Sequence, residues 1–219
     1  MHWGLVILPD LSWPQAAAAF REAEERGFTT AWTYDHLSWR SLRDGPWLGA
    51  VPLLSAAAAV TSTLRLGTLV ASPNYRHPAL LAKDIMTLDR ISDGRVDLGI
   101  GAGGTGFDAD VLGVPTLTPG QRAARFEEFA DCLDLLLREP EADFSGEWFT
   151  VVESRTHPGC VQQPRVPFTV AASGPRAMRV VARLASRWVT FGPLGNASGP
   201  DEWFAGVADQ TRRLEVACH

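Results

Sequence analysis

Short apolar runs alternate with longer segments of helical periodicity along the whole chain. The apolar runs that predict strands are residues 3–8, 28–34, 64–70, 96–101, 166–172 and 187–191. Each run is followed by a segment that predicts a helix, with helices expected at 12–27, about 47–60, 77–94, 118–136, 175–185 and 200–216. This alternation of strand and helix is typical of a parallel α/β sheet, and we count six βα units.

Several predicted helices carry signals at their ends. Ser12-Trp13-Pro14-Gln15 and Thr118-Pro119-Gly120-Gln121 both begin with a hydroxyl residue and reach glutamine three positions later, with a proline between, which predicts a capping box. Gly27 is placed to end the first helix in a left-handed conformation. An excursion at about 143–164 begins with a predicted hairpin, and no repeat or linker divides residues 1–219, so we expect a single domain.

The pattern leaves two architectures open. Parallel strands with right-handed crossovers either curl into a barrel or form an open doubly wound sheet. In both architectures the loops that follow the strands form the functional face, so candidate chemistry is sought there.

Composition and charge restrict the kinds of binding partner that we expect. The 219 residues have a formal net charge of −5 and no cluster of Lys and Arg, which argues against a nucleic-acid partner. No apolar run approaches the roughly 20 residues that cross a bilayer, and no secretion signal is seen, so we expect a cytoplasmic protein without a membrane partner. The five histidines are scattered and the three cysteines are far apart, so we predict no metal site and no disulfide.

The loop after the second strand reads Tyr34-Asp35-His36. His36 can act as a general acid or base, and Asp35 can orient a ligand, although a surface loop pair is the alternative. Trp39 and Trp47 follow and either wall a pocket or pack as ordinary loop residues. After the third strand, residues 70–78 predict a sharply turned backbone, with His77 capping the next helix.

The loop after the fourth strand, residues 99–104, matches G-x-G-x-x-G. Its position after a fourth strand argues against a dinucleotide fingerprint, but the bare backbone would let a planar ligand come close. Asp108 and Asp110 are then either polar contacts at the rim or solvated loop acids. After the fifth strand, residues 171–176 enter a helix, where free amides and Arg176 suit a phosphate, an ordinary N-cap being the alternative.

Taken together, these loops resemble the bacterial luciferase-like family. The stretches that carry the resemblance are Gly67-Thr68-Leu69-Val70, Arg76-His77-Pro78-Ala79-Leu80-Leu81-Ala82-Lys83, Leu88-Asp89-Arg90-Ile91-Ser92-Asp93-Gly94-Arg95, Phe144-Ser145-Gly146-Glu147 and Ala172-Ser173-Gly174-Pro175-Arg176. The family includes bacterial luciferase, FMN-dependent monooxygenases, and F420-dependent dehydrogenases and reductases.

The resemblance implies a TIM-type (β/α) barrel with a flavin or deazaflavin ring at the carboxyl ends of the strands. Asp35 and His36 match residues near the ring, and Asp108 stands in the loop where the dehydrogenase branch often has a glutamate. The remaining implied contacts are with the cofactor: Ala71 and Ser72 at a strand end with a non-prolyl cis bulge, Gly103 and Gly104 beside the ring, and Ala172, Ser173, Gly174 and Arg176 in the phosphate loop.

A complete barrel of this type needs about 250 residues, so we expect one that stops after about six βα units. The resemblance favours an oxidoreductase that uses F420, or else FMN, for hydride transfer or monooxygenation of a small organic substrate, with His36 as proton donor and a homodimer as the assembly. Two alternatives remain: a non-catalytic flavin-binding or partner-subunit protein, and an NAD enzyme on a doubly wound sheet.

Overall fold

Six parallel strands form one curled sheet in the computed structural model, which describes residues 2–106, 108–193 and 199–218. The strands are β1 (Gly4–Val6), β2 (Thr30–Thr33), β3 (Arg65–Thr68), β4 (Val96–Gly101), β7 (Phe168–Ala171) and β8 (Arg187–Val189). Their order in the sheet is β1-β2-β3-β4-β7-β8, so the strands of this sheet lie side by side in the order in which they occur along the chain. A doubly wound sheet reverses its order at a switch point. The predicted barrel class is therefore confirmed, as a curled part of a barrel.

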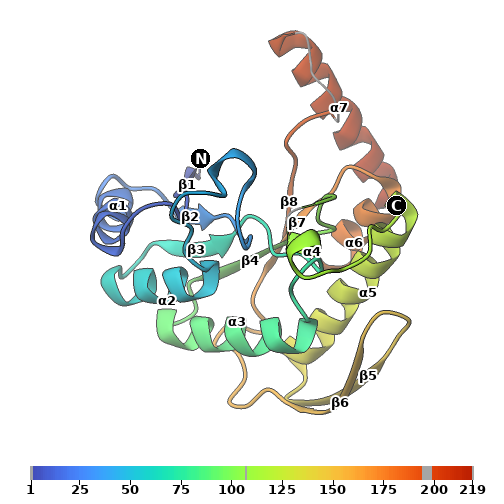
Figure 1. Ribbon diagram of the computed structural model, residues 1–219, viewed down its shortest axis with the longest axis horizontal. Coiled ribbons are helices and arrows are strands. Elements are labelled where there is room, and N and C mark those ends of the chain that lie inside the picture. Colours follow the sequence, from blue (N-terminus) through green and yellow to red (C-terminus); the bar gives the residue numbers. More distant parts are fainter. Residues whose placement is uncertain (1, 107, 194–198, 219) are drawn as a thin grey trace.

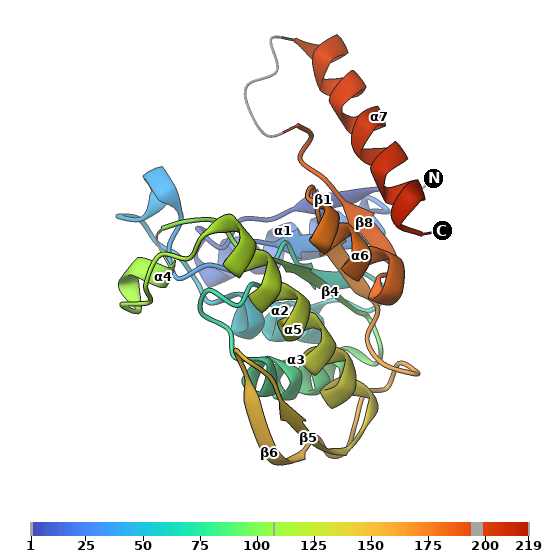
Figure 2. The same ribbon diagram turned by 90° about the vertical axis from the view of Figure 1, so that its right-hand side faces the viewer.

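The helices of the described residues are α1 (Trp13–Glu25), α2 (Ala50–Val60), α3 (Pro78–Ser92), the short α4 (Asp108–Val111), α5 (Pro119–Arg138), α6 (Pro175–Leu184) and α7 (Pro200–Ala217), with a 3-10 turn η1 (Arg40–Leu42). Helices α1, α2, α3, α5 and α6 cover the outer side of this sheet, and the remaining helices lie elsewhere (Figure 1). The last helix, α7, packs against α6 and projects from the rest of the molecule in both views (Figure 2).

The core lies between the sheet and these helices. All six residues of β4 are buried, as expected for a strand with neighbours on both sides. On α5 the predicted inner face is confirmed, because Phe126, Phe129, Leu133 and Leu136 are at most 1% exposed. Side chains of this size each contribute roughly 1.5–3 kcal/mol when they are fully buried.

The predicted helix starts are mostly confirmed at the atomic level. The Gln15 side chain accepts a hydrogen bond from the Ser12 amide at 3.2 Å, and Gln121 does the same for Thr118 at 2.9 Å. Gly27 has a φ of +79°, the left-handed conformation that ends α1. One expected start is wrong, since α2 begins at Ala50 instead of Trp47.

The shift in α2 has a structural cause. The Trp47 indole donates to the carbonyl of His36 at 2.9 Å, and the Leu48 amide donates to the carbonyl of Pro9 at 2.7 Å. These contacts hold the two residues in the loop, and Gly49 becomes the N-cap.

The excursion contains the predicted hairpin, formed by β5 (Glu141–Ser145) and the antiparallel β6 (Thr150–Arg155). Glu128 on α5 holds its turn, accepting hydrogen bonds from the amides of Glu147, Trp148 and Phe149 at 2.6–2.9 Å. Asp89 on α3 holds the return segment by accepting from the Val161 amide at 2.7 Å. Within the described ranges, no helix combines the length and the apolar character needed to cross a membrane.

Glu24 joins the end of α1 to the start of β3. Its Oε1 accepts hydrogen bonds from the amides of Ser62, Thr63 and Leu64 at 2.5–2.8 Å. Burial would raise the pKa of this carboxyl, but the amide donors outweigh it and lower the pKa to about 2.

We therefore expect Glu24→Gln to reduce the free energy of unfolding by about 1 kcal/mol at pH 7, a value discounted for solvent screening. Because the folded pKa lies below the unfolded one, this stabilisation is present above pH 4.5 and is lost as the pH falls toward 2. Urea unfolding at pH 7, 5 and 3 checks it. The difference from wild type should shrink as the pH is lowered, and Glu25→Gln, which alters an exposed neighbour, should have little effect at any pH.

Candidate active site

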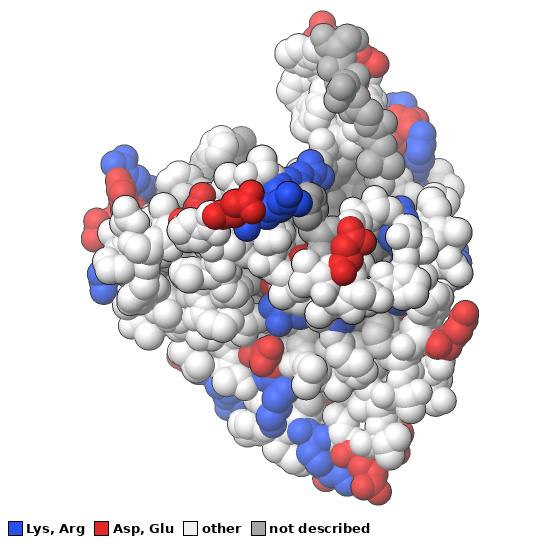
Figure 3. Space-filling model, in the orientation of Figure 1, with Lys and Arg blue, Asp and Glu red and all other residues white. Residues whose placement is uncertain are grey.

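The loops that follow β2, β3, β4, β7 and β8 surround a cavity of about 660 Å³ at one edge of the sheet. Parallel strands bring their carboxyl ends to the same edge, and a volume of about 300–1,000 Å³ is usual for sites that bind small molecules and cofactors. The molecule is visibly hollowed between its main body and the projecting α7 (Figure 3). The lining residues are Tyr34, His36, Trp39, Arg40, Leu69, Val70, Ser72, Asn74, Gly101 to Gly106, Asp108, Ala171 to Ser173 and Val189 to Gly192.

His36 and Asp108 form a hydrogen-bonded pair at this cavity. The Nδ1 atom of His36 lies 2.6 Å from Oδ2 of Asp108, and the other carboxylate oxygen accepts from the Leu37 amide at 2.8 Å. The Asp108 side chain is 3% exposed, whereas 21% of the His36 side chain is exposed. An ionised carboxylate fixes Nδ1 as a donor, which leaves Nε2 as the nitrogen that can exchange a proton with a ligand.

Aromatic rings pack around the imidazole. The ring centroid of Trp39 lies 4.4 Å from that of His36, and Tyr34 meets His36 edge-on at 6.4 Å. The Arg40 guanidinium stacks on the Trp39 ring at 4.5 Å. Of the two tryptophans considered from the sequence, Trp39 lines the cavity, and Trp47 only fixes the His36 backbone.

Asp35 does not line the cavity with His36. It is fully buried, and its carboxylate accepts hydrogen bonds from Arg76 at 2.6 and 3.0 Å and from the Tyr75 hydroxyl. Burial, and after it the negative charge of Asp35, raise the pKa of Tyr75, so this phenol stays protonated and donates. Asp35 thus ties the loop after β2 to the loop after β3.

The loop after β3 contributes Ser72 and Asn74 to the lining, while Ala71 is buried behind it. A non-prolyl cis peptide is present, but it joins Leu69 to Val70, two residues before the predicted position at Ala71 and Ser72. The cis bond therefore falls directly after β3, and Leu69 and Val70 themselves line the cavity.

The glycine loop after β4 forms another part of the wall. Gly103 has a φ of +71°, and a Cβ at that position would lie 2.6 Å from Nδ2 of Asn74. Asn74 donates to the carbonyl of Gly104 at 3.1 Å, so glycine is required where the two loops meet. Gly103 and Gly104 thus form a stretch of bare backbone in the wall, where the sequence places it.

The predicted phosphate loop divides into two parts. Ala172 and Ser173 line the cavity, and Gly174 is the N-cap of α6. Arg176 lies outside the lining and forms an ion pair with Glu127 at 3.0 Å. The helix end and the Ser173 hydroxyl remain suited to an anion.

Sequence reasoning missed Asn74 and Arg40, which line the cavity, and gave no weight to residues 190–192. Asn74 carried no local signal, because its partner Arg125 is 51 residues away. Among the residues that the structure describes, no three His, Cys, Asp or Glu side chains are grouped to hold a metal ion.

Two features of the cavity bear on the kind of ligand it can hold. Its volume lies in the range usual for small-molecule sites, and the backbone at residues 101–104 carries no large side chain that would keep a planar ligand away. The His36 and Asp108 pair belongs to the β2 and β4 loops, while the amino end of α6 belongs to the loop after β7. An imidazole held by a carboxylate and the amino end of a helix therefore lie at the same cavity.

Comparison with known families gives a match over residues 1–217 to the family described as luciferase-like monooxygenase. Three relatives illustrate the match. An uncharacterised protein of Mycobacterium tuberculosis is 35% identical over 87% of this chain and 72% of its own. The F420-dependent glucose-6-phosphate dehydrogenase of Beutenbergia cavernae is 34% identical over 76% of this chain and 49% of its own. The 5,10-methylenetetrahydromethanopterin reductase of Methanopyrus kandleri is 28% identical over 94% of this chain and 58% of its own.

Solved structures show the same fold. The monooxygenase RslO1 from Streptomyces bottropensis superposes with a TM-score of 0.81 at 24% identity, covering 100% of this chain and 66% of that one. An F420-dependent secondary alcohol dehydrogenase superposes with a TM-score of 0.78 at 20% identity, covering 98% of this chain and 66% of that one. Riboflavin lyase with a modified FMN superposes with a TM-score of 0.82 at 18% identity, covering 99% of this chain and 58% of that one. The chain therefore spans about two thirds or less of these structures.

The contact between Gly103 and Asn74 yields a stability prediction. Gly103→Ala should cost about 1–3 kcal/mol, because it places a Cβ in a left-handed residue and against the Asn74 side chain. Gly104→Ala is the matched control, since a Cβ there meets nothing within 4 Å. Urea unfolding of both variants measures the difference, and equal stability would show that the two loops do not meet as described.

Proposed function

The chain belongs to the luciferase-like family, and on that premise we propose that it is an oxidoreductase that holds a deazaflavin or flavin ring in the cavity described above. Its substrate is a small organic molecule that is reduced, oxidised or oxygenated beside His36. The observation that carries the proposal is the hydrogen-bonded pair of His36 and Asp108 in the wall of a cavity of about 660 Å³.

F420 is the cofactor that we favour. Relatives at 33–34% identity are named F420-dependent glucose-6-phosphate dehydrogenases, and they match 76–77% of this chain. FMN is the second candidate, since riboflavin lyase with a modified FMN shares the fold. When bound, the ring would supply the electron transfer, as hydride or oxygen chemistry.

The residues of this chain have separate roles in the proposal. His36 would hold or release a proton at Nε2, while Asp108 fixes the Nδ1 side and stabilises the protonated imidazole. Trp39 and Tyr34 would exclude water around the imidazole. A phosphate on the cofactor tail would meet the Ser173 hydroxyl and the amino end of α6.

A second candidate is a flavin-binding or subunit-partner protein without turnover. It is favoured by the two outer strands of the sheet, because β1 and β8 each pair on one side only among the described residues. An unpaired parallel edge is a place where another chain can add. A homodimer of the kind expected from the resemblance would be one such assembly. Steady turnover by the isolated chain would refute this candidate.

The first test is a titration of the purified chain with F420 and, separately, with FMN, followed by cofactor fluorescence. We expect saturable binding of F420 at micromolar concentration and weaker binding of FMN, because the cavity is already formed. Tighter binding of FMN than of F420 would make FMN the proposed cofactor. If neither F420 nor FMN bound, the proposal would be contradicted.

The second test is His36→Ala. We expect turnover to fall by roughly 10²–10⁴-fold, the usual contribution of a positioned acid or base, while the cofactor Kd changes less than about threefold. His157→Ala is the control, since His157 is exposed on the excursion and lies 3.6 Å from Glu141 in a loose surface pair. Turnover by His36→Ala at the wild-type rate would remove His36 from the mechanism.

A further inference from the structure

Arg125 is a buried cation without a carboxylate partner among the described residues. It lies on α5 and is 7% exposed, and its Nη2 donates to Oδ1 of Asn74 at 2.6 Å. Its Nε is buried, and no hydrogen-bond acceptor for it is found among the residues that the structure describes. Buried charges are normally paired, and leaving one unpaired destabilises the fold, so such a residue calls for an explanation in function.

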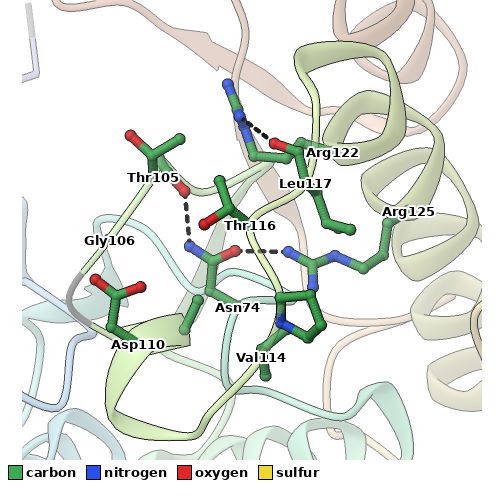
Figure 4. Close-up of a pocket in the computed structure, with 12 residues that line it drawn as sticks. Asn74, Thr105, Gly106, Asp110, Val114, Thr116, Leu117, Arg122 and Arg125 are labelled. Atoms are coloured by element: carbon green, nitrogen blue, oxygen red, sulfur yellow. Dashed lines mark hydrogen bonds between the residues drawn. The ribbon is translucent and has the colours of Figure 1, made fainter.

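The surrounding charges do not neutralise Arg125. Burial, and then the nearby positive charge of Arg122, lower its pKa, yet a guanidinium stays protonated in proteins. Asp108 is engaged with His36, and Asp110 is exposed. In the close-up, Asp110 lies on the far side of Asn74 from Arg125 (Figure 4).

The charge is connected to the cofactor cavity through one side chain. Asn74 accepts from Arg125 and donates to the carbonyl of Gly104, and both Asn74 and Gly104 line the large cavity. The guanidinium is therefore a single hydrogen bond away from a side chain in the wall around the proposed ring. The effective dielectric of a protein interior is lower than that of water, so a buried charge interacts more strongly with a nearby charge than it would in water.

We propose that Arg125 is an electrostatic positioning residue, whose uncompensated charge, held to the cavity wall by Asn74, stabilises negative charge on the bound ring. This inference rests on the proposed function. A flavin-type ring that takes up two electrons and one proton gains one negative charge. Arg125 therefore favours the reduced ring over the oxidised ring, beyond its part in holding the loop.

The test compares the Kd of oxidised and chemically reduced cofactor, F420 or FMN, whichever binds in the titration above. The reduced form is measured anaerobically by its competition with the fluorescent oxidised form. In Arg125→Gln we expect the preference for the reduced form to fall by about tenfold, which corresponds to about 30 mV for a two-electron couple. The Kd of the oxidised form should change by less than about threefold.

Two variants separate charge from packing. Arg125→Lys keeps the charge and should retain most of the preference for the reduced ring. Arg122→Gln removes a neighbouring cation that is more exposed and donates to the carbonyl of Leu117, so it should shift the preference by less than about threefold. Thermal unfolding of each variant confirms that it is folded.

Three results would overturn the inference. Arg125→Gln could weaken the binding of the oxidised and the reduced cofactor equally, which would make the role of Arg125 merely structural. A folded Arg125→Lys could lose the preference as fully as Arg125→Gln, which would exclude charge as the cause. Failure of the wild-type chain to bind either form would instead refute the proposed function, and the inference would fall with it.

Discussion

The site depends on one buried ion pair. Asp35 is fully buried, and without the hydrogen bonds from Arg76 and Tyr75 its charge would be strongly destabilising. The pair joins the loops after β2 and β3, and this connection holds His36 and Asn74 on the same cavity wall. From Asn74 the polar contacts continue to Gly104 and Arg125, so three loops and α5 are fixed relative to one another.

Much of the fold could be predicted because its signals are local. Strand β4 was expected at 96–101 and lies there, since an apolar run between a glycine turn and a glycine-rich loop strongly favours a buried strand. The capping residues Ser12 and Thr118 likewise act within four positions of themselves. The predicted start of α2 was wrong because Trp47 and Leu48 are held by residues elsewhere in the chain, which no local pattern reports.

The site was harder to predict, for the same reason. Asp35 and His36 are adjacent, but only His36 lines the cavity, and the partner that orients it, Asp108, is 72 residues away. Some stretches that carry the family resemblance prove to be structural. Arg95 donates to the carbonyls of Ala58 and Leu64, and Asp89 holds the excursion, so these residues maintain the scaffold without touching the cavity.

The sequential strand order also bears on how the chain acquires its shape. Each new strand of the described sheet adds beside the previous strand of that sheet, and among the described residues only the step from β4 to β7 passes over an inserted hairpin. Contacts between near neighbours in sequence close small loops and form early. The sheet can therefore grow from β1 onward in the order in which a ribosome delivers it, and each completed unit presents a template for the next.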